Sequence, residues 1–141
     1  MQKLYMRLFM WLNTFFIRIS KGKLGSNLGG NQILLLHTIG RHTGKAYTIP
    51  LNHYRHGRDY VVVASNWARA TNPGWYYNVL AQPETTIEFK GETVAVSAHE
   101  AVAEEREKLW REITAVYKQY PKYQAKTSRL IPLIVLVPKE N

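Results

Sequence analysis

Residues 33–54 read ILLLHTIGRHTGKAYTIPLNHY, two apolar stretches separated by a short segment rich in glycine and cations. Apolar runs of this length, bounded by turn residues, predict strands, so the segment predicts a hairpin. Pro50 lies inside the second run, and a proline there predicts a sheet edge or a bulge because it has no amide hydrogen to donate. We therefore expect the sheet to begin with an antiparallel pair.

The chain after this hairpin predicts four more short strands and two helices. The strands are expected at residues 60–64, 85–89, 93–98 and 134–137. The first helix is expected to begin at Asn72, whose side chain would cap the free amides, and the second near Glu104, where the dipole favours negative charge. Short turns favour antiparallel pairing, and closing the sheet removes its exposed edges. The prediction is an α+β, mainly β domain over residues 31–141, a six-stranded antiparallel barrel with two helices.

Residues 1–30 have a different pattern. Residues 1–19 predict an amphipathic helix with apolar and aromatic residues on one face and cations on the other, and residues 21–30 predict a glycine-rich joint. The longest uncharged stretch, residues 8–17, is too short to cross a bilayer, and no signal-peptide cleavage site follows it, so we expect a cytoplasmic protein. The apolar face either packs on the sheet or on a second copy of the chain in a homodimer, or it lies in an anionic membrane surface at the inner face of the cell membrane.

The composition excludes several kinds of chemistry. The 141 residues contain no cysteine, which rules out thiol nucleophiles, disulfides, iron–sulfur clusters and cysteine-based zinc sites. The net charge of +9 indicates an anionic partner, and the cations concentrate in residues 1–60, where Asp59 is the only acidic residue. No nucleic-acid-binding motif accompanies this charge, so nucleic acid is not the expected partner.

The turn at residues 40–45, GRHTGK, is the strongest candidate for a binding site. Its glycines allow successive backbone amides to point inward, and its side chains add positive charge and a hydroxyl, a combination that suits a phosphate. A glycine-flanked basic hairpin turn also occurs without any ligand. The composition of the turn leaves both interpretations open.

Two aromatic features are further candidates. The free amides of the helix start attract an anion and Trp75 offers a flat face to an aromatic ring, although the same side chain would also fill a core. Tyr117, Tyr120 and Tyr123 are spaced three residues apart along one side of a helix end, where their hydroxyls could orient a polar substrate or donate a proton. Three buried tyrosines would have the same spacing. No cluster of histidines and carboxylates indicates a metal site.

Four blocks of this sequence resemble the deazaflavin-dependent nitroreductase family, namely GRHTGKAYTIPL, VVASN, NPGWYYNVLAQP and YKQYPKYQAKTSRLIP. The resemblance covers about residues 31–138. It implies a split β-barrel of the flavin-reductase, FMN-binding type. It also implies an oxidoreductase that uses the 8-hydroxy-5-deazaflavin coenzyme F420 to reduce quinones or nitroaromatic compounds by hydride transfer. Members of this family can associate with membranes through the amino-terminal helix, which favours the membrane interpretation of residues 1–19.

The resemblance implies which residues hold the coenzyme. The basic turn would bind its phosphate, two strand segments would line its ring, and the start of the helix would contact it through amides and an aromatic side chain. The implied residues are Arg41, His42, Thr43, Lys45, Thr48, Ile49, Pro50, Leu51, Asn52, Val63, Ala64, Ser65, Asn66, Gly74, Trp75, Tyr76, Tyr77 and Asn78.

The resemblance also implies the catalytic residues. Tyr120, helped by Tyr117 and Tyr123, would face the substrate, which is a quinone or a nitroaromatic compound. Ser65 would lie near the reactive carbon of the coenzyme ring.

Three positions depart from the family pattern, because Thr43, Tyr47 and Asn66 stand where the family usually has Ser, Arg and Lys. Thr43 keeps the hydroxyl, but the loss of two cations weakens the grip on an acidic, polyglutamylated tail. These departures leave two alternatives to an F420-dependent reductase. One is a reductase that binds FMN, and the other is a carrier that binds a flavin or a lipid on the same barrel without a reaction.

Overall fold

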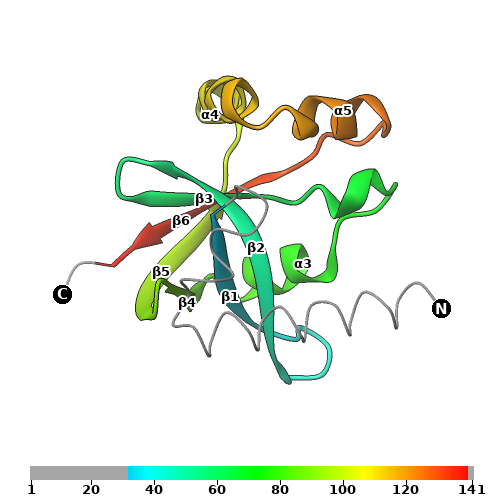
Figure 1. Ribbon diagram of the computed structural model, residues 1–141. Helices are drawn as coiled ribbons and strands as arrows, with labels where there is room; N and C mark the ends of the chain where they lie inside the picture. The colour runs from blue at the N-terminus through cyan, green and yellow to red at the C-terminus, as the bar shows by residue number, and fades with distance from the viewer. Residues whose placement is uncertain (1–31, 140–141) are drawn as a thin grey trace.

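Six antiparallel strands close into a barrel within residues 32–139, the part of the chain that the computed structural model describes (Figure 1). Their order around the barrel is β1-β2-β3-β6-β5-β4, and β4 pairs back onto β1. The strands are β1 (Ile33–Ile39), β2 (Ala46–His56), β3 (Asp59–Val63), β4 (Glu84–Phe89), β5 (Glu92–Glu100) and β6 (Leu133–Pro138). The predicted six-stranded antiparallel barrel is confirmed. The helix and joint predicted in residues 1–30 lie outside the described residues.

Strand β2 is longer than its neighbour β3, and this leaves part of β2 at an edge. Residues 53–56 pair with β3, whereas residues 46–52 pair, among the described strands, with β1 alone. Pro50 lies in the second part, opposite Leu35. A proline cannot donate a hydrogen bond to a second neighbouring strand, so this position agrees with the edge predicted from the sequence. The candidate coenzyme-binding residues within 48–52 therefore lie on this edge segment of β2.

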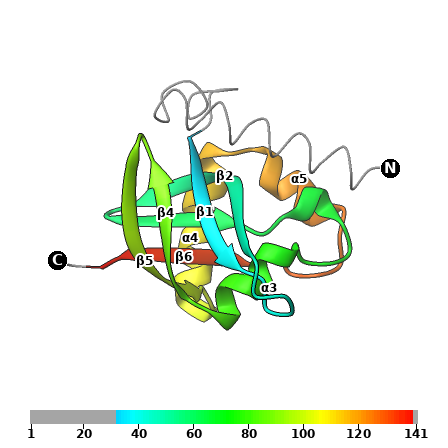
Figure 2. The ribbon, with the colours of Figure 1, turned by 90° about the horizontal axis from the view of Figure 1, so that it is seen from below.

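Two apolar clusters stabilise the fold, one on each side of the sheet. The inner cluster fills the barrel with alternate strand residues and with Trp75 and Val79 of α3 (Gly74–Ala81). The outer cluster joins β3 and β6 to the helices α4 (Ala103–Val116) and α5 (Gln119–Ala125), which lie together on one side of the barrel (Figure 1). The turned view in Figure 2 shows α3 beside the turn that joins β1 to β2.

The start of α3 differs from the prediction. The helix begins at Gly74 and has no side-chain cap. Asn72, which was expected to cap it, instead accepts a hydrogen bond at Oδ1 from Arg129 Nη1, at 2.7 Å. A charged donor makes a stronger hydrogen bond than a neutral backbone amide, which explains the choice of partner. Tyr76 N donates to Pro73 O at 3.1 Å, so the amides of Gly74 and Trp75 are the ones left for a ligand at the start of α3.

His53 on β2 is buried in the barrel, with 2% of its surface exposed. Its Nδ1 donates a hydrogen bond to the Gln32 carbonyl at 3.1 Å, and its ring centroid lies 4.7 Å from that of Phe89 and 5.3 Å from that of Tyr60. Its Nε2 has no hydrogen-bond partner among the described residues. Burial is the main cause that lowers the pKa of His53 from 6.5 to about 4. The folded protein therefore holds this histidine neutral.

We expect acid to destabilise the fold through His53. The unfolded chain binds a proton at this residue near pH 6.5 and the folded chain only near pH 4, so stability is present above pH 6.5 and is lost as the pH falls between these values. At pH 5 the loss from this group is about 2 kcal/mol. Urea unfolding at about pH 7.5 and pH 5 measures it. Between pH 7.5 and pH 5, the free energy of unfolding of His53→Phe should fall by about 2 kcal/mol less than that of the wild type. Equal decreases in the two proteins would contradict the prediction.

Candidate functional site

The turn between β1 and β2 is closed by its own backbone. Gly40 N donates to Lys45 O at 2.7 Å, and Gly44 N donates to Gly40 O at 2.8 Å. Gly44 has a φ of 72°, in the left-handed region that glycine adopts without a steric cost. Thr43 Oγ1 accepts a hydrogen bond from Lys45 N at 3.2 Å. The turn is therefore a defined structure that presents the side chains of residues 41–43.

Arg41 connects this turn to α3. Its Nη1 donates to Asn78 Oδ1 at 2.9 Å, and its backbone N donates to the same oxygen at 3.2 Å. The guanidinium carbon lies 4.9 Å from the centroid of the Tyr77 ring. Asn78 is buried, so its oxygen is a fixed acceptor at the surface of the helix. These contacts bring together two candidate sites that are more than 30 residues apart in the sequence.

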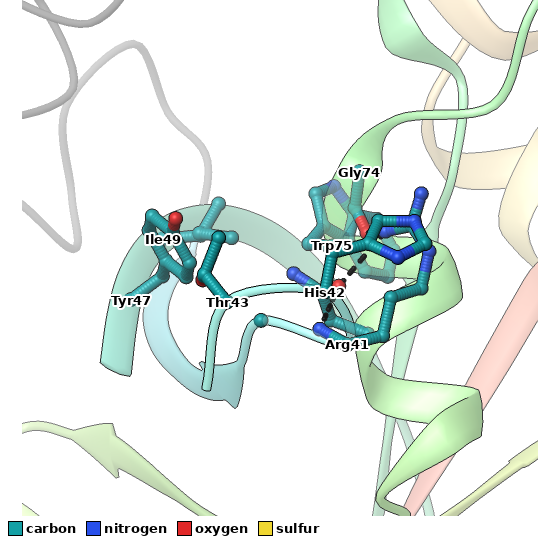
Figure 3. A pocket seen from close by; sticks show the side chains of 9 residues that line it. Arg41, His42, Thr43, Tyr47, Ile49, Gly74 and Trp75 are labelled. Carbon is teal, nitrogen blue, oxygen red and sulfur yellow. Dashed lines mark hydrogen bonds between the residues drawn. The ribbon is translucent and has the colours of Figure 1, made fainter. Parts of the chain in front are cut away.

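A cavity of about 290 Å³ lies between the turn, β2 and the start of α3. Figure 3 shows Tyr47 and Ile49 of β2 on one side of it and Gly74 and Trp75 on the other. The lining residues are Gly40, Arg41, His42, Thr43, Tyr47, Ile49, Gly74, Trp75 and Asn78. The Arg41 guanidinium, the His42 ring, the Thr43 hydroxyl and the start of α3 thus face one space, which suits a phosphate on a larger molecule.

Trp75 belongs mainly to the core. Its side chain packs in the inner cluster and is 7% exposed, although it also lines the cavity. Trp75 therefore both fills the core and forms part of the cavity wall. The small exposed part of the side chain leaves little of its flat face for stacking.

The tyrosine row (Tyr117, Tyr120 and Tyr123) lies across the junction of α4 and α5 and not on one helix. Helix α4 ends at Val116, Tyr117 has extended backbone angles, and α5 begins at Gln119. Pro121 explains the break, since in one continuous helix its missing amide would have to donate to the Tyr117 carbonyl. The three rings still contact in sequence, with centroids 6.0 Å apart from Tyr117 to Tyr120 and 6.1 Å apart from Tyr120 to Tyr123.

The Tyr120 hydroxyl lies beside β2. It accepts a hydrogen bond from Asn52 Nδ2 at 3.4 Å, and no described residue accepts its proton. Asn52 Oδ1 is also buried and has no hydrogen-bond partner among the described residues. Burial raises the pKa of Tyr120 to about 12, so the hydroxyl keeps its proton at neutral pH. By contrast, Tyr117 donates its proton to the His53 carbonyl at 3.2 Å.

Other predicted residues do not line the cavity. Thr48 on β2 contacts His37 through its hydroxyl, at 3.0 Å from Nδ1. Lys45 is exposed in the turn. The remaining residues of β2 and β3 lie in the sheet, with Pro50 opposite Leu35, Leu51 against the inner cluster and Val63 against the outer cluster.

The predicted residues after β3 and within α3 are also held by the protein itself. The carbonyls of Ala64 and Ser65 accept hydrogen bonds from Arg129, and the Asn66 side chain donates to the Thr71 carbonyl at 2.8 Å. Tyr76 donates its hydroxyl proton to Glu100. None of the three tyrosines lines the cavity, so the cavity and the tyrosine row are two separate groups of predicted residues.

Two cavity residues and one structural residue were not assigned from the sequence. Gly40 and Tyr47 line the cavity, and a Cβ atom on Gly40 would lie 2.6 Å from Thr43 Oγ1. A side chain at position 40 would therefore force the Thr43 side chain to shift. Arg129 lies in the last block of the family pattern, but no local signal shows which groups it binds.

Residues 32–139 contain no group of three or more His, Asp or Glu side chains that could hold a metal ion. None of their helices is long and apolar enough to cross a membrane.

The chain is similar to several known proteins. A profile of the F420H(2)-dependent quinone reductase family matches residues 9–138. A curated protein of Mycobacterium tuberculosis (strain ATCC 25618 / H37Rv), named as an F420H(2)-dependent quinone reductase, is 33% identical over 129 residues, which cover 89% of this chain and 87% of that protein. The solved structure of an F420-H2 dependent reductase, FDR-A, is 34% identical with a TM-score of 0.67 and covers 74% of this chain and 92% of its own. A structure described as a domain-swapped dimer is 30% identical with a TM-score of 0.69, covering 89% of this chain and 96% of its own.

Proposed function

This chain belongs to the F420H(2)-dependent quinone reductase family, and on that basis we propose that it binds reduced coenzyme F420 and transfers a hydride from it to a quinone. The observation that carries the proposal is the cavity between the 40–45 turn and the start of α3. F420 in the names of the family and of the relatives favours this coenzyme over FMN. The word reductase in the same names favours an enzyme over a carrier.

The cavity residues fit the phosphate-bearing part of the coenzyme. Arg41 supplies a cation, His42 a hydrogen-bonding ring, Thr43 a hydroxyl, and the start of α3 uncapped amides. Tyr47, where the family usually has Arg, lines the cavity and is 40% exposed, so it offers a ring and a hydroxyl in place of a charge. Asn66, where the family often has Lys, does not line the cavity. The departures therefore affect one side of the site and leave its anion-binding groups in place.

The coenzyme, when bound, supplies the hydride. The protein binds and orients it through the turn and α3, and the apolar side chains of Ile49 and Trp75 exclude water from the wall of the cavity. Tyr120 keeps its proton and directs it toward a ligand, since its oxygen already accepts from Asn52. We assign Tyr120 as the donor to the quinone oxygen that gains negative charge as the hydride arrives.

We extend the proposal to the second acceptor, the partners and the location. A nitroaromatic compound is also a planar hydride acceptor and would use the same residues. The amphipathic pattern of residues 1–19 supports a peripheral contact with the inner face of the cell membrane in a cytoplasmic protein. The similarity to a domain-swapped dimer supports a homodimer.

Two mixtures test the proposed function. In the first, the purified protein is added to reduced F420 and menadione, and oxidation of the coenzyme is followed by its absorbance. We expect oxidation that scales with the amount of protein. The second mixture replaces the coenzyme with FMN and NADPH, and we expect no enzyme-dependent oxidation. Activity in the second mixture alone would support an FMN reductase, and binding of F420 without oxidation would support a carrier.

A further inference from the structure

Arg129 makes four hydrogen bonds to one loop that lies 57 to 65 residues earlier in the sequence. Nε donates to Arg69 O at 2.9 Å, Nη2 donates to Ser65 O at 2.7 Å, and Nη1 donates to Asn72 Oδ1 at 2.7 Å and to Ala64 O at 3.2 Å. All three nitrogens of the guanidinium are therefore used on residues 64–72. A planar group with donors in fixed directions suits four separate acceptors, whereas a lysine ammonium is a single point of charge.

The loop that Arg129 binds is conformationally strained. Asn66, Trp67 and Ala68 have φ values of 48°, 56° and 63°, three consecutive non-glycine residues in the left-handed region. This conformation is unfavourable for a non-glycine residue, and contacts with the surrounding structure must offset its energy. None of the three is buried, and Trp67 is 63% exposed, so apolar packing of their own side chains does not hold them. The turn is closed by its own hydrogen bonds, from Ala68 N to Ser65 O at 2.9 Å and from Arg69 N to Asn66 O at 3.1 Å, and those of Arg129 on both sides add a restraint from a distant part of the chain.

Arg129 is itself held by α5. Gln124 Nε2 donates to Arg129 O at 2.7 Å, and Gln124 Oε1 accepts from Ile131 N at 2.9 Å. Gln124 lies one residue after Tyr123 and on the same helix as Tyr120. One continuous set of contacts therefore runs from the tyrosine row, through Arg129, to the loop. The loop in turn leads directly into the start of α3 at the cavity.

We propose that Arg129 is a positioning residue for hydride transfer. It fixes the loop of residues 64–72, called here the Ser65 loop, and the start of α3 in position relative to the tyrosines of α5. This inference rests on the proposed function. Arg129 lines no part of the cavity, so it would act through the groups that it holds. The cavity itself is held by other contacts, namely those of Arg41 with Asn78 and the packing of Trp75. Loss of Arg129 should consequently misalign the reacting groups more than it weakens coenzyme binding.

Arg129→Lys tests this inference in the full chain. We expect kcat with reduced F420 and menadione to fall at least about tenfold, because lysine keeps the charge but cannot bind four acceptors at once. The Kd for F420 and the KM for menadione should stay within about threefold of the wild type. Arg106→Lys is the matched control, because Arg106 also donates to a main-chain carbonyl, that of Ile131 at 2.6 Å, but makes no hydrogen bond to residues 64–72. We expect kcat of this control to remain at the wild-type level.

A second measurement reports on the loop without any coenzyme. The carbonyl of Arg69, whose peptide bond trypsin cleaves, accepts the hydrogen bond from Arg129 Nε. Limited trypsin digestion, read by mass spectrometry, should therefore cut after Arg69 at least about tenfold faster in Arg129→Lys than in the wild type or in Arg106→Lys. If Arg129→Lys does not fold, Asn72→Ala removes one of the four acceptors and should lower kcat about threefold.

The outcomes separate the two proposals. Wild-type turnover together with an unchanged kcat in folded Arg129→Lys would overturn the positioning role. A fall in kcat without faster cleavage after Arg69 would overturn it too, because the loop would then not depend on Arg129. If the wild type itself shows no turnover with reduced F420, the proposed function fails. The digestion would in that case still decide whether Arg129 holds the loop.

Discussion

Tyr120→Phe is expected to lower kcat for quinone reduction about 100-fold and to leave the coenzyme Kd within about twofold of the wild type. The raised pKa of Tyr120 keeps its hydroxyl protonated, and the hydrogen bond from Asn52 leaves that proton free for an acceptor. Phenylalanine keeps the ring that packs in the outer cluster and removes only the hydroxyl. The loss should therefore appear in the reaction and not in coenzyme binding.

Steady-state kinetics with menadione gives kcat, and titration of coenzyme fluorescence gives Kd. Tyr54→Phe is the matched control, because it removes a hydroxyl that donates to Glu112 Oε1 at 2.9 Å from a ring packed against the same cluster. We expect this control to keep the wild-type kcat. An equal loss of affinity and turnover in Tyr120→Phe would instead assign Tyr120 to coenzyme binding, and an unchanged kcat would exclude it as the proton donor.

Arg41→Ala is expected to raise the coenzyme Kd about 10- to 100-fold, which corresponds to the loss of about 1.5–3 kcal/mol from hydrogen bonds to a charged group. The side chain is the cation of the cavity that also connects the turn to α3 through Asn78. Both effects act on binding. At saturating coenzyme, kcat should change much less than Kd.

Arg58→Ala provides the comparison for charge alone. Arg58 lies in the turn after β2, at the opposite end of that strand from the 40–45 turn, and its removal changes the net charge by the same amount. We expect the Kd of this variant to stay within about threefold of the wild type, and both variants are measured over a range of salt concentrations. Equal increases in Kd for Arg41→Ala and Arg58→Ala would show that net charge, and not a contact in the cavity, attracts the coenzyme.

The sheet is the part of the protein that follows most directly from local sequence. Apolar runs of strand length, separated by glycine-rich or charged turns, predicted six strands, and the structure has them within a few residues of the expected positions. The position of Pro50 at an edge follows from the missing amide of proline, a property of one residue. The closed barrel follows from short antiparallel connections and from the cost of an unpaired edge.

The composition of the candidate site was also readable from the sequence. A turn with glycines, two cations and a hydroxyl predicts an anion-binding loop wherever it occurs in the fold. The resemblance to a known family added the coenzyme and the tyrosine row. These are properties of short segments, and they do not depend on which segment lies opposite.

The tertiary structure alone decided how these segments meet. Arg41 contacts Asn78, and Arg129 takes the side chain of Asn72 that local rules assign to a helix cap. Both pairs are more than 30 residues apart in the sequence. Local sequence rules consider only the hydrogen-bond partners that a polar group has within a few residues. A charged donor that the fold brings close makes a stronger hydrogen bond than those partners do. The sequence by itself determined the strands and the chemical character of the turn, while the cavity and the restraint on the Ser65 loop exist only because closure of the barrel places distant residues in contact.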